Sequence, residues 1–296
     1  MRTTFKLFSL LFILTAFVAC SDDDEGGATI TEFTVTAISP ESGPVGTEIT
    51  ITGTDFPTDA AAINLTFGGV VATINSVSST QIITTVPAGA PSGEVSIAAN
   101  GFTKTTPASF TVLSELISGT MENLYAPQTG GQGQGEIGGE FTKFSFATGD
   151  ITESETEWDI AFRGTTIAVN GGIQTGTNQE PPRDGNAAAV IVDGIFNEVN
   201  SAEGLTFVQD ADAAFAIPTG SDNGWYNYNF MTNLVTPIPG KILIFRTYDG
   251  RFAKVEILSY YENAPTNPDG FTDPARYYTF NYVYNPNEGE TDLTSN

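Results

Sequence analysis

The sequence predicts an all-β protein built from two successive modules. Its 296 residues are enough for two domains of ordinary size. The chain contains 31 Gly, 16 Pro, 21 Phe and 10 Tyr, a composition that suits short strands joined by many turns. Short segments in which apolar and polar residues alternate recur along the chain, as expected of strands with one buried face.

The charge and the missing residue types exclude several classes of function. The formal net charge is −24, there is no histidine, and cysteine occurs once. Such a field repels nucleic acid, because phosphate binding needs clustered Lys and Arg. Nucleophilic systems that use an imidazole base and most zinc sites are also excluded. No carboxylate pair is singled out by its spacing, so we predict that the protein is not an enzyme.

The N-terminus predicts a lipoprotein signal peptide over residues 1–19. Arg2 and Lys6 lead into an apolar run from Leu7 to Ala19, which is shorter than the roughly 20 residues of a bilayer span but suits a secretory signal. The sequence Phe17-Val18-Ala19-Cys20 resembles a lipobox, which implies that Cys20 is acylated and anchors the protein to the outer membrane. A plain cleaved signal is the alternative. Loss of the leader leaves nine basic residues against 35 acidic ones, a net charge of −26.

An acidic segment follows the cysteine, within a predicted tether over residues 20–32. It consists of Ser21, Asp22, Asp23, Asp24 and Glu25. This run resembles the export signal that carries some lipoproteins to the cell surface, and we therefore expect surface exposure. The alternative is a solvated spacer, since like charges repel one another and keep a chain extended.

The first module is predicted over residues 33–113. Ile49, Ile51 and Gly53 alternate with polar residues as in a half-buried strand. Further strands are expected at 64–67, 70–74, 81–85, 94–98 and 109–112. The motifs are Ile38-Ser39-Pro40, Gly53-Thr54-Asp55-Phe56, Phe67-Gly68-Gly69 and Val86-Pro87-Ala88-Gly89. Together they resemble the IPT/TIG family. That resemblance implies an immunoglobulin-like β sandwich acting as a spacer, with a ligand-binding face as the alternative.

The second, larger module is predicted over residues 115–293. Strands are expected at 141–146, 158–163 and 167–169. Asp249-Gly250 between two apolar runs predicts a hairpin. A last strand at 276–284 places Tyr278, Phe280, Tyr282 and Tyr284 on one face, which we expect to be buried. Helix is scarce, with one helical turn expected near residues 210–214.

This second module resembles the HmuY family of haem-binding lipoproteins. The motifs that carry the resemblance are Trp158-Asp159-Ile160-Ala161-Phe162-Arg163, Gly224-Trp225-Tyr226, Ile238-Pro239-Gly240-Lys241, Arg246-Thr247-Tyr248-Asp249-Gly250 and Ser259-Tyr260-Tyr261. The resemblance implies an antiparallel all-β domain that captures haem at the cell surface. It also implies an outer-membrane haem receptor as a possible partner.

The resemblance further implies candidate haem-binding residues, because members that bind haem ligate its iron through His or Met. Without histidine, the available axial ligands are Met231, Met121 and the tyrosine phenolates, and no metal other than haem iron is expected. Trp225, Tyr226 and Tyr228 precede Met231 and could flank a porphyrin. Arg163 could pair with a propionate. The simpler readings are methionines that fill gaps in a core and an ordinary surface arginine.

The leading hypothesis is therefore a non-catalytic surface lipoprotein that binds haem or a related flat apolar ligand. The alternative is an adhesion or glycan-binding surface protein that keeps the HmuY-like fold without haem ligation. The absence of histidine favours this alternative.

Overall fold

The computed structural model describes residues 31–131 and 133–295. The predicted signal peptide, Cys20 and the acidic segment at residues 21–25 lie outside the described part. The chain divides into two compact units, residues 31–41 with 46–110 and residues 42–45 with 111–295. Residues 42–45 join the second unit because β2 (Ser42–Pro44) pairs in parallel with β10 (Thr111–Leu113). In the described residues, no helix has the length and apolar character needed to cross a bilayer.

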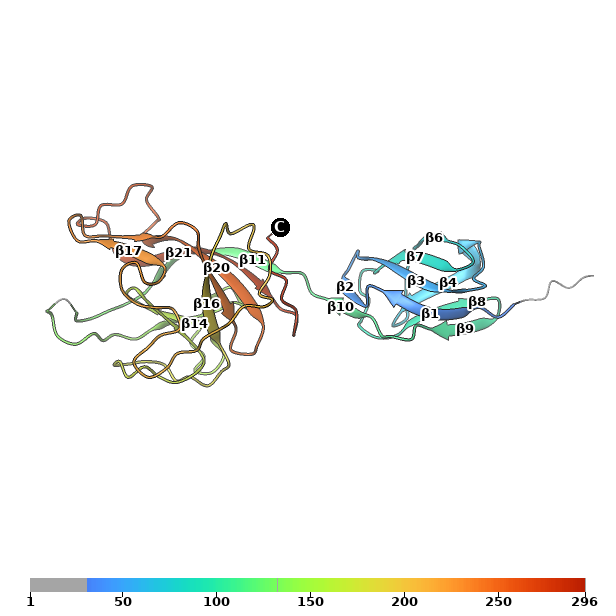
Figure 1. Cartoon of the computed structure of the whole chain (residues 1–296), viewed down its shortest axis with the longest axis horizontal. Coiled ribbons are helices and arrows are strands. Elements are labelled where there is room, and N and C mark those ends of the chain that lie inside the picture. The colour runs from blue at the N-terminus through green and yellow to red at the C-terminus, as the bar shows by residue number, and fades with distance from the viewer. Residues whose placement is uncertain (1–30, 132, 296) are drawn as a thin grey trace, which may run out of the picture. The chain divides into compact units, whose positions relative to one another are not determined.

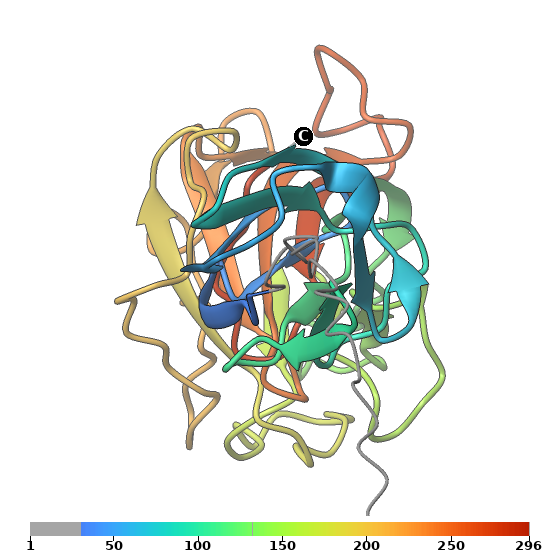
Figure 2. The ribbon, with the colours of Figure 1, turned by 90° about the vertical axis from the view of Figure 1, so that its right-hand side faces the viewer.

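The first unit is a sandwich of two antiparallel sheets (Figures 1 and 2). One sheet has the order β1-β3-β7-β6 and the other β5-β4-β8-β9. The elements are β1 (Thr34–Ser39), β3 (Glu48–Thr54), the 3₁₀ turn η1 (Ala60–Ala62), β4 (Ile63–Phe67), β5 (Val70–Val71), β6 (Ile74–Val77), β7 (Gln81–Thr85), β8 (Val95–Ala99) and β9 (Phe102–Thr105).

Alternation along the strands fills the space between these sheets. Ile49 and Ile51 of β3 are buried, as are Leu65 and Phe67 of β4 on the facing sheet. The strand that we expected at 70–74 is instead two strands. β5 pairs with β4 and β6 pairs with β7, so the chain changes sheets between them.

The second unit combines a five-stranded antiparallel sheet, β11-β21-β20-β19-β16, with a four-stranded one, β13-β12-β14-β15, and the separate hairpin β17-β18. The strands are β11 (Ile117–Tyr125), β12 (Thr142–Ser145), β13 (Asp150–Ile151), β14 (Ile160–Arg163), β15 (Thr166–Val169), β16 (Ala188–Asp193), β17 (Tyr226–Asn229), β18 (Leu234–Pro237), β19 (Lys241–Arg246), β20 (Phe252–Tyr261) and β21 (Ala275–Asn285). The expectation of an all-β fold is confirmed.

An aromatic core joins the two larger sheets. Tyr278, Phe280, Tyr282 and Tyr284 of β21 are all buried, so the predicted buried face of this strand is confirmed. Their rings contact rings of the four-stranded sheet. The ring centroids of Phe280 and Phe144, for example, are 5.3 Å apart. Such edge-to-face pairs add about 0.5–1.5 kcal/mol beyond the burial of their area. Residues of both β20 and β21 belong to this core, which holds the two strands in place within the five-stranded sheet.

The helical turn expected near residues 210–214 is not formed. Ala211 and Ala214 instead exchange backbone hydrogen bonds of 2.8 and 3.0 Å, and Ala213 has a φ of 58°. The Asp210 carboxylate accepts the backbone N–H of Ala216 at 2.8 Å. This side-chain bond favours a tight turn over a helix, because aspartate competes for backbone groups.

Candidate ligand-binding site

A cavity of about 440 Å³ lies in the second unit, where three loop segments project from one end. Figure 1 shows these segments beyond the sheets: the loop after β11, the hairpin β17-β18 and the loop between β20 and β21. The cavity is lined by Gln128, Gly130, Gly131, Gln134, Thr165, Ser221, Tyr226, Tyr228, Asn233, Val235, Tyr260, Tyr261, Gly270, Ala275 and Arg276. Four of these side chains are tyrosines, and none is acidic.

Two of the four tyrosines come from β17 and are fixed through their hydroxyl groups. Thr165 donates a hydrogen bond to the Tyr226 hydroxyl at 3.2 Å, and the Tyr228 hydroxyl donates to Asn233 at 2.9 Å. Trp225 lies behind the wall, with its ring centroid 4.9 Å from that of Tyr226. The Trp225 indole N–H donates to the Thr165 carbonyl at 3.0 Å. The wall is thus held before any ligand arrives.

The other two tyrosines lie at the end of β20. The ladder between β20 and β21 shifts register on both sides of Ser259. A bulge re-aims the side chains that follow it, and both Tyr260 and Tyr261 are buried although they are consecutive. The Tyr261 hydroxyl accepts the backbone N–H of Val235 at 3.0 Å. This bond ties the hairpin to the main sheet.

Arg276, at the start of β21, is the cation of the cavity lining. Its Nη1 donates to the Gln128 carbonyl at 2.6 Å, and its charge lowers the pKa of Tyr260 against the larger, opposite effect of burial. Its φ of 74° is in the left-handed region, which is unusual for a residue other than glycine. A guanidinium carries five N–H donors, so donors remain for a carboxylate that enters the cavity.

Comparison with known proteins bears on both units. The IPT/TIG domain family matches residues 34–112. Residues 34–112 form an IPT/TIG domain. No curated protein sequence matches the chain.

Several solved structures are similar to parts of this chain. They include a protein from Bacteroides vulgatus described as HmuY-like and haem-binding (14% identity, TM-score 0.35, covering 60% of this chain and 97% of that chain). Another is the apo HmuY analogue of Tannerella forsythia (13%, 0.35, 59% and 99%). A third is an auxiliary nutrient binding protein from Bacteroides ovatus (14%, 0.28, 76% and 67%). At such identities a similar fold does not imply a shared ligand.

The structure brings some of the predicted site residues together. Tyr226 and Tyr228 line the cavity, and Trp225 is buried behind them. Met231 lies in the turn of the hairpin, 72% exposed and outside the cavity lining. Met121, on β11, is partly buried against the aromatic core and is not part of the lining either.

Arg163 is not part of the cavity lining and is 2% exposed. Its guanidinium donates to the carbonyls of Gly139 and Asn178 and to the Thr177 hydroxyl. It also lies 4.3 Å from the centroid of the Phe141 ring. These contacts tie two loops to β14, so the side chain has a structural role in this arrangement.

Sequence reasoning missed Tyr260, Tyr261 and Arg276 as site residues. The signal was present in the Tyr260-Tyr261 pair, because two large aromatic side chains in succession break the alternation of a strand. Nothing in the sequence indicated that Arg276, among the cations of the chain, would face a cavity.

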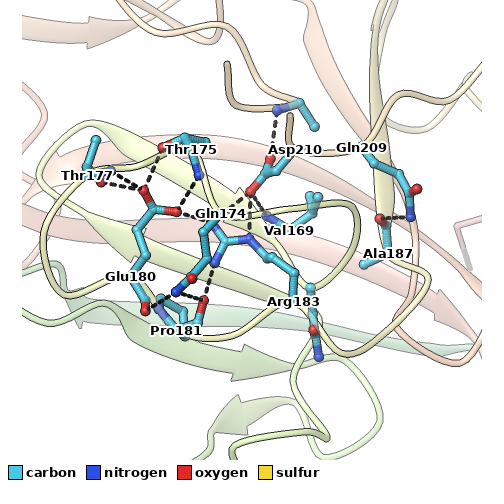
Figure 3. A network of polar contacts seen from close by, with 12 residues as sticks. Val169, Gln174, Thr175, Thr177, Glu180, Pro181, Arg183, Ala187, Gln209 and Asp210 are labelled. Carbon is cyan, nitrogen blue, oxygen red and sulfur yellow. Dashed lines mark hydrogen bonds and ion pairs between the residues drawn. The ribbon is translucent and has the colours of Figure 1, made fainter. Parts of the chain in front are cut away.

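A polar cluster outside the cavity lining holds the loop that follows β15 (Figure 3). Arg183 forms ion pairs of 2.9 Å with both Glu180 and Asp210, and all three side chains are almost fully buried. Asp210 also accepts the backbone N–H of Val169 at 3.2 Å. Burial raises the pKa of Asp210 to about 6, although Arg183 opposes the shift. Glu180 accepts hydrogen bonds from Thr175 and Thr177.

Asp159 is a further buried carboxylate with a structural role. It accepts the backbone N–H groups of Phe146 at 2.7 Å and Tyr248 at 3.1 Å, and thereby joins two turns. Burial raises its pKa to about 7, against the effect of these two hydrogen bonds. In residues 31–131 and 133–295, no three His, Cys, Asp or Glu residues are placed to hold a metal ion.

The residues around the cavity do not fit coordination of a haem iron. Neither methionine lines the cavity. The hydroxyls of three of its four tyrosines, Tyr226, Tyr228 and Tyr261, are engaged in hydrogen bonds. Burial also raises the pKa of Tyr260 and of Tyr261 above the ordinary value, which disfavours the phenolate that would bind iron. The flat faces and the single cation suit an organic ring better than a metal.

Proposed function

We propose that the protein is a non-catalytic ligand-binding lipoprotein, and that its second unit holds a flat, partly apolar, carboxylate-bearing ligand in the tyrosine cavity. A porphyrin such as haem is the first candidate. It would be held by ring contacts and by Arg276 rather than by a bond to its iron. The acylated Cys20 and the acidic run after it would place this unit at the cell surface, where an outer-membrane receptor could take the ligand onward.

One observation carries this proposal: the cavity lining contains four tyrosines and an arginine but no acidic side chain. The chain has 35 acidic residues and only 11 basic ones. A site built for a cation would be expected to use those carboxylates. The absence of acids from the lining that contains Arg276 instead favours an anionic group on the ligand. Tyrosine faces supply apolar contact area at little entropic cost, because each side chain has two rotatable bonds.

A spectroscopic titration tests the proposal. Haemin, and separately metal-free protoporphyrin IX, is added to the chain without its leader, residues 21–296. We expect both to bind with similar affinity, seen as a shifted and sharpened Soret band and as quenching of the fluorescence of Trp225, which lies behind the cavity wall. Tyr228→Ala should weaken the binding of both compounds. Arg246→Gln is a matched control, because Arg246 donates to the Asn186 carbonyl away from the cavity lining. Unchanged spectra with both compounds would refute the proposal.

A further inference from the structure

Three exposed apolar side chains lie beside the cavity. Phe230 is 78% exposed, and Met231 and Phe271 are each 72% exposed. Among the described residues, these are the most exposed of the large hydrophobic side chains. Single exposed apolar residues are ordinary, but these three come from only two segments, the turn of the hairpin β17-β18 and the loop between β20 and β21. We call them the apolar lip.

The two segments of the lip are fastened to each other. The Asn233 side-chain amide donates to the Gly270 carbonyl at 2.6 Å. The backbones also approach closely here, because a Cβ added at Gly270 would lie 2.4 Å from the carbonyl oxygens of both Thr232 and Asn233. Only glycine permits this approach. Phe271 is thereby held beside the turn that carries Phe230 and Met231.

The same contacts join the lip to the cavity. Asn233 and Gly270 both belong to the cavity lining, and Asn233 accepts the hydrogen bond of the Tyr228 hydroxyl. The polar members of the lining include Arg276 and Gln128, whereas the lip beside it is wholly apolar. The site therefore has a polar interior with a cation and an apolar border.

The volume of the cavity limits how much of a ligand it can enclose. At about 440 Å³, the cavity lies toward the lower end of the roughly 300–1,000 Å³ that enclose drug-sized ligands. A macrocycle that placed one edge at Arg276 would extend past the cavity border. Burial of its protruding apolar edge against the lip would remove apolar surface of both partners from water.

We infer that the ligand is amphipathic, with carboxylates on the edge that enters the cavity and apolar substituents on the opposite edge, which the lip covers. This inference rests on the proposed function and narrows its ligand class. Porphyrins with carboxylates on one edge only should bind, and those with carboxylates around the whole ring should not. A second copy of this strongly acidic chain, or an anionic membrane, fits the lip less well, because the net charge opposes both.

The test compares two metal-free porphyrins and two variants of residues 21–296. Protoporphyrin IX carries its two carboxylates on one edge, whereas uroporphyrin I carries eight around the ring. The lip variant is the double substitution Phe230→Ser with Phe271→Ser. The matched control is Ile195→Ser, an exposed apolar residue of the same unit that is 61% exposed. Fluorescence titration gives the affinities, and sedimentation gives the mass of the unliganded chain.

We expect the lip variant to lose about 10-fold or more in affinity for protoporphyrin IX, as for removal of aromatic anchors from a binding site. The control should bind like the unchanged protein, and uroporphyrin I should bind weakly to all three.

Binding of protoporphyrin IX that is unaffected by the lip substitutions, or equal affinity for uroporphyrin I, would overturn the inference and leave the proposed function intact. Failure of both porphyrins to bind would overturn the proposed function with it. A dimer that the lip substitutions dissociate would identify the lip as a self-association surface and likewise overturn the inference.

Discussion

Two arginines of the second unit differ in what surrounds them. Arg163 belongs to the segment Trp158–Arg163 that carries much of the resemblance to the HmuY family, and it is almost fully buried and bonded to loop carbonyls. Arg276 belongs to no such segment, yet it lines the cavity with Tyr260 beside it. The motif that is easiest to notice in the sequence thus holds the domain together. The residues suited to a ligand come from the ends of strands and from loops.

The carboxylates show the same contrast. Asp159 and Asp210 are buried acceptors of backbone N–H groups, and Glu180 and Asp210 share Arg183 (Figure 3). The cavity lining contains no acid. Substitution of one of these buried carboxylates, or of Arg183, should therefore change the free energy of unfolding, whereas substitution of a cavity residue should change ligand affinity. The predictions below test this division, from the largest expected effect to the smallest.

The largest effect is expected from Arg183→Leu. This substitution leaves Glu180 and Asp210 buried without their cation, which typically costs about 3–5 kcal/mol in the free energy of unfolding. Urea denaturation followed by tryptophan fluorescence measures it, since Trp158 and Trp225 are both buried. Lys241→Ala is the control, because its 2.7 Å pair with Asp193 is exposed and should be worth about 1 kcal/mol or less. A loss for Arg183→Leu no greater than that of the control would contradict the structural role.

The next effect concerns pH and Asp159. Its folded-state pKa of about 7 lies above its ordinary value of 3.8, so between these two values the folded protein holds a proton that the unfolded chain releases. The contribution of this group to stability is therefore complete below pH 4 and is lost as the pH rises through 7, with a slope of up to about 1.4 kcal/mol per pH unit.

Asp159→Asn isolates this dependence, because asparagine does not titrate. The variant should be less stable at acid pH, since its amide cannot accept both backbone N–H groups, at a cost of about 1–3 kcal/mol. The unfolding free energy of the natural protein minus that of the variant should fall from pH 4 to pH 7, and at the full slope it changes sign within this range. Urea midpoints at several pH values measure it, with Asp193→Asn as an exposed control. A difference that stays constant across this range would show that Asp159 does not hold the extra proton.

The sequence predicted the regular parts of this molecule better than its site. Alternation identified β3 and β7, and the aromatic face of β21 identified the core, because burial of one face imposes a period of two. The break between β5 and β6 escaped prediction, since a change of sheet leaves the hydrophobic pattern intact. Tyr226 and Tyr228 were chosen for their position before Met231, and they line the cavity.

The remaining site residues depend on tertiary contacts that no local pattern specifies. Tyr260 and Tyr261 reach the cavity through bulges in β20. Arg276 lines it next to Gln128, a residue 148 positions earlier in the chain to which its guanidinium is bonded. Arg163, a candidate on the strength of its motif, became buried because loop carbonyls surround it. A local sequence pattern reports which face of a strand is buried, and it does not report which loops meet at its end.

A smaller effect, on affinity rather than stability, is expected from Arg276→Gln. Glutamine keeps a donor for the Gln128 carbonyl but removes the charge that would pair with a ligand carboxylate. We expect the affinity for protoporphyrin IX to fall about 10-fold, which corresponds to about 1.4 kcal/mol, while the unfolding free energy changes by less than about 1 kcal/mol. The titration described above measures the first quantity and urea denaturation the second. A large loss of stability with unchanged affinity would show that Arg276, like Arg163, has a structural role and does not bind the ligand.

The smallest effect is expected from Met231→Leu, and it decides between coordination and packing. Leucine has a similar volume and apolar character but no sulfur, so it cannot ligate iron. If Met231 serves only as part of the apolar lip, the substitution should change the affinities for haemin and for metal-free protoporphyrin IX by less than about 2-fold. Met231→Ala should weaken both compounds equally, because it removes apolar contact whether or not a metal is present. A loss of the haemin Soret shift in Met231→Leu, with protoporphyrin IX binding unchanged, would instead assign Met231 as an iron ligand, which would require the hairpin turn to fold over the ligand from its exposed position.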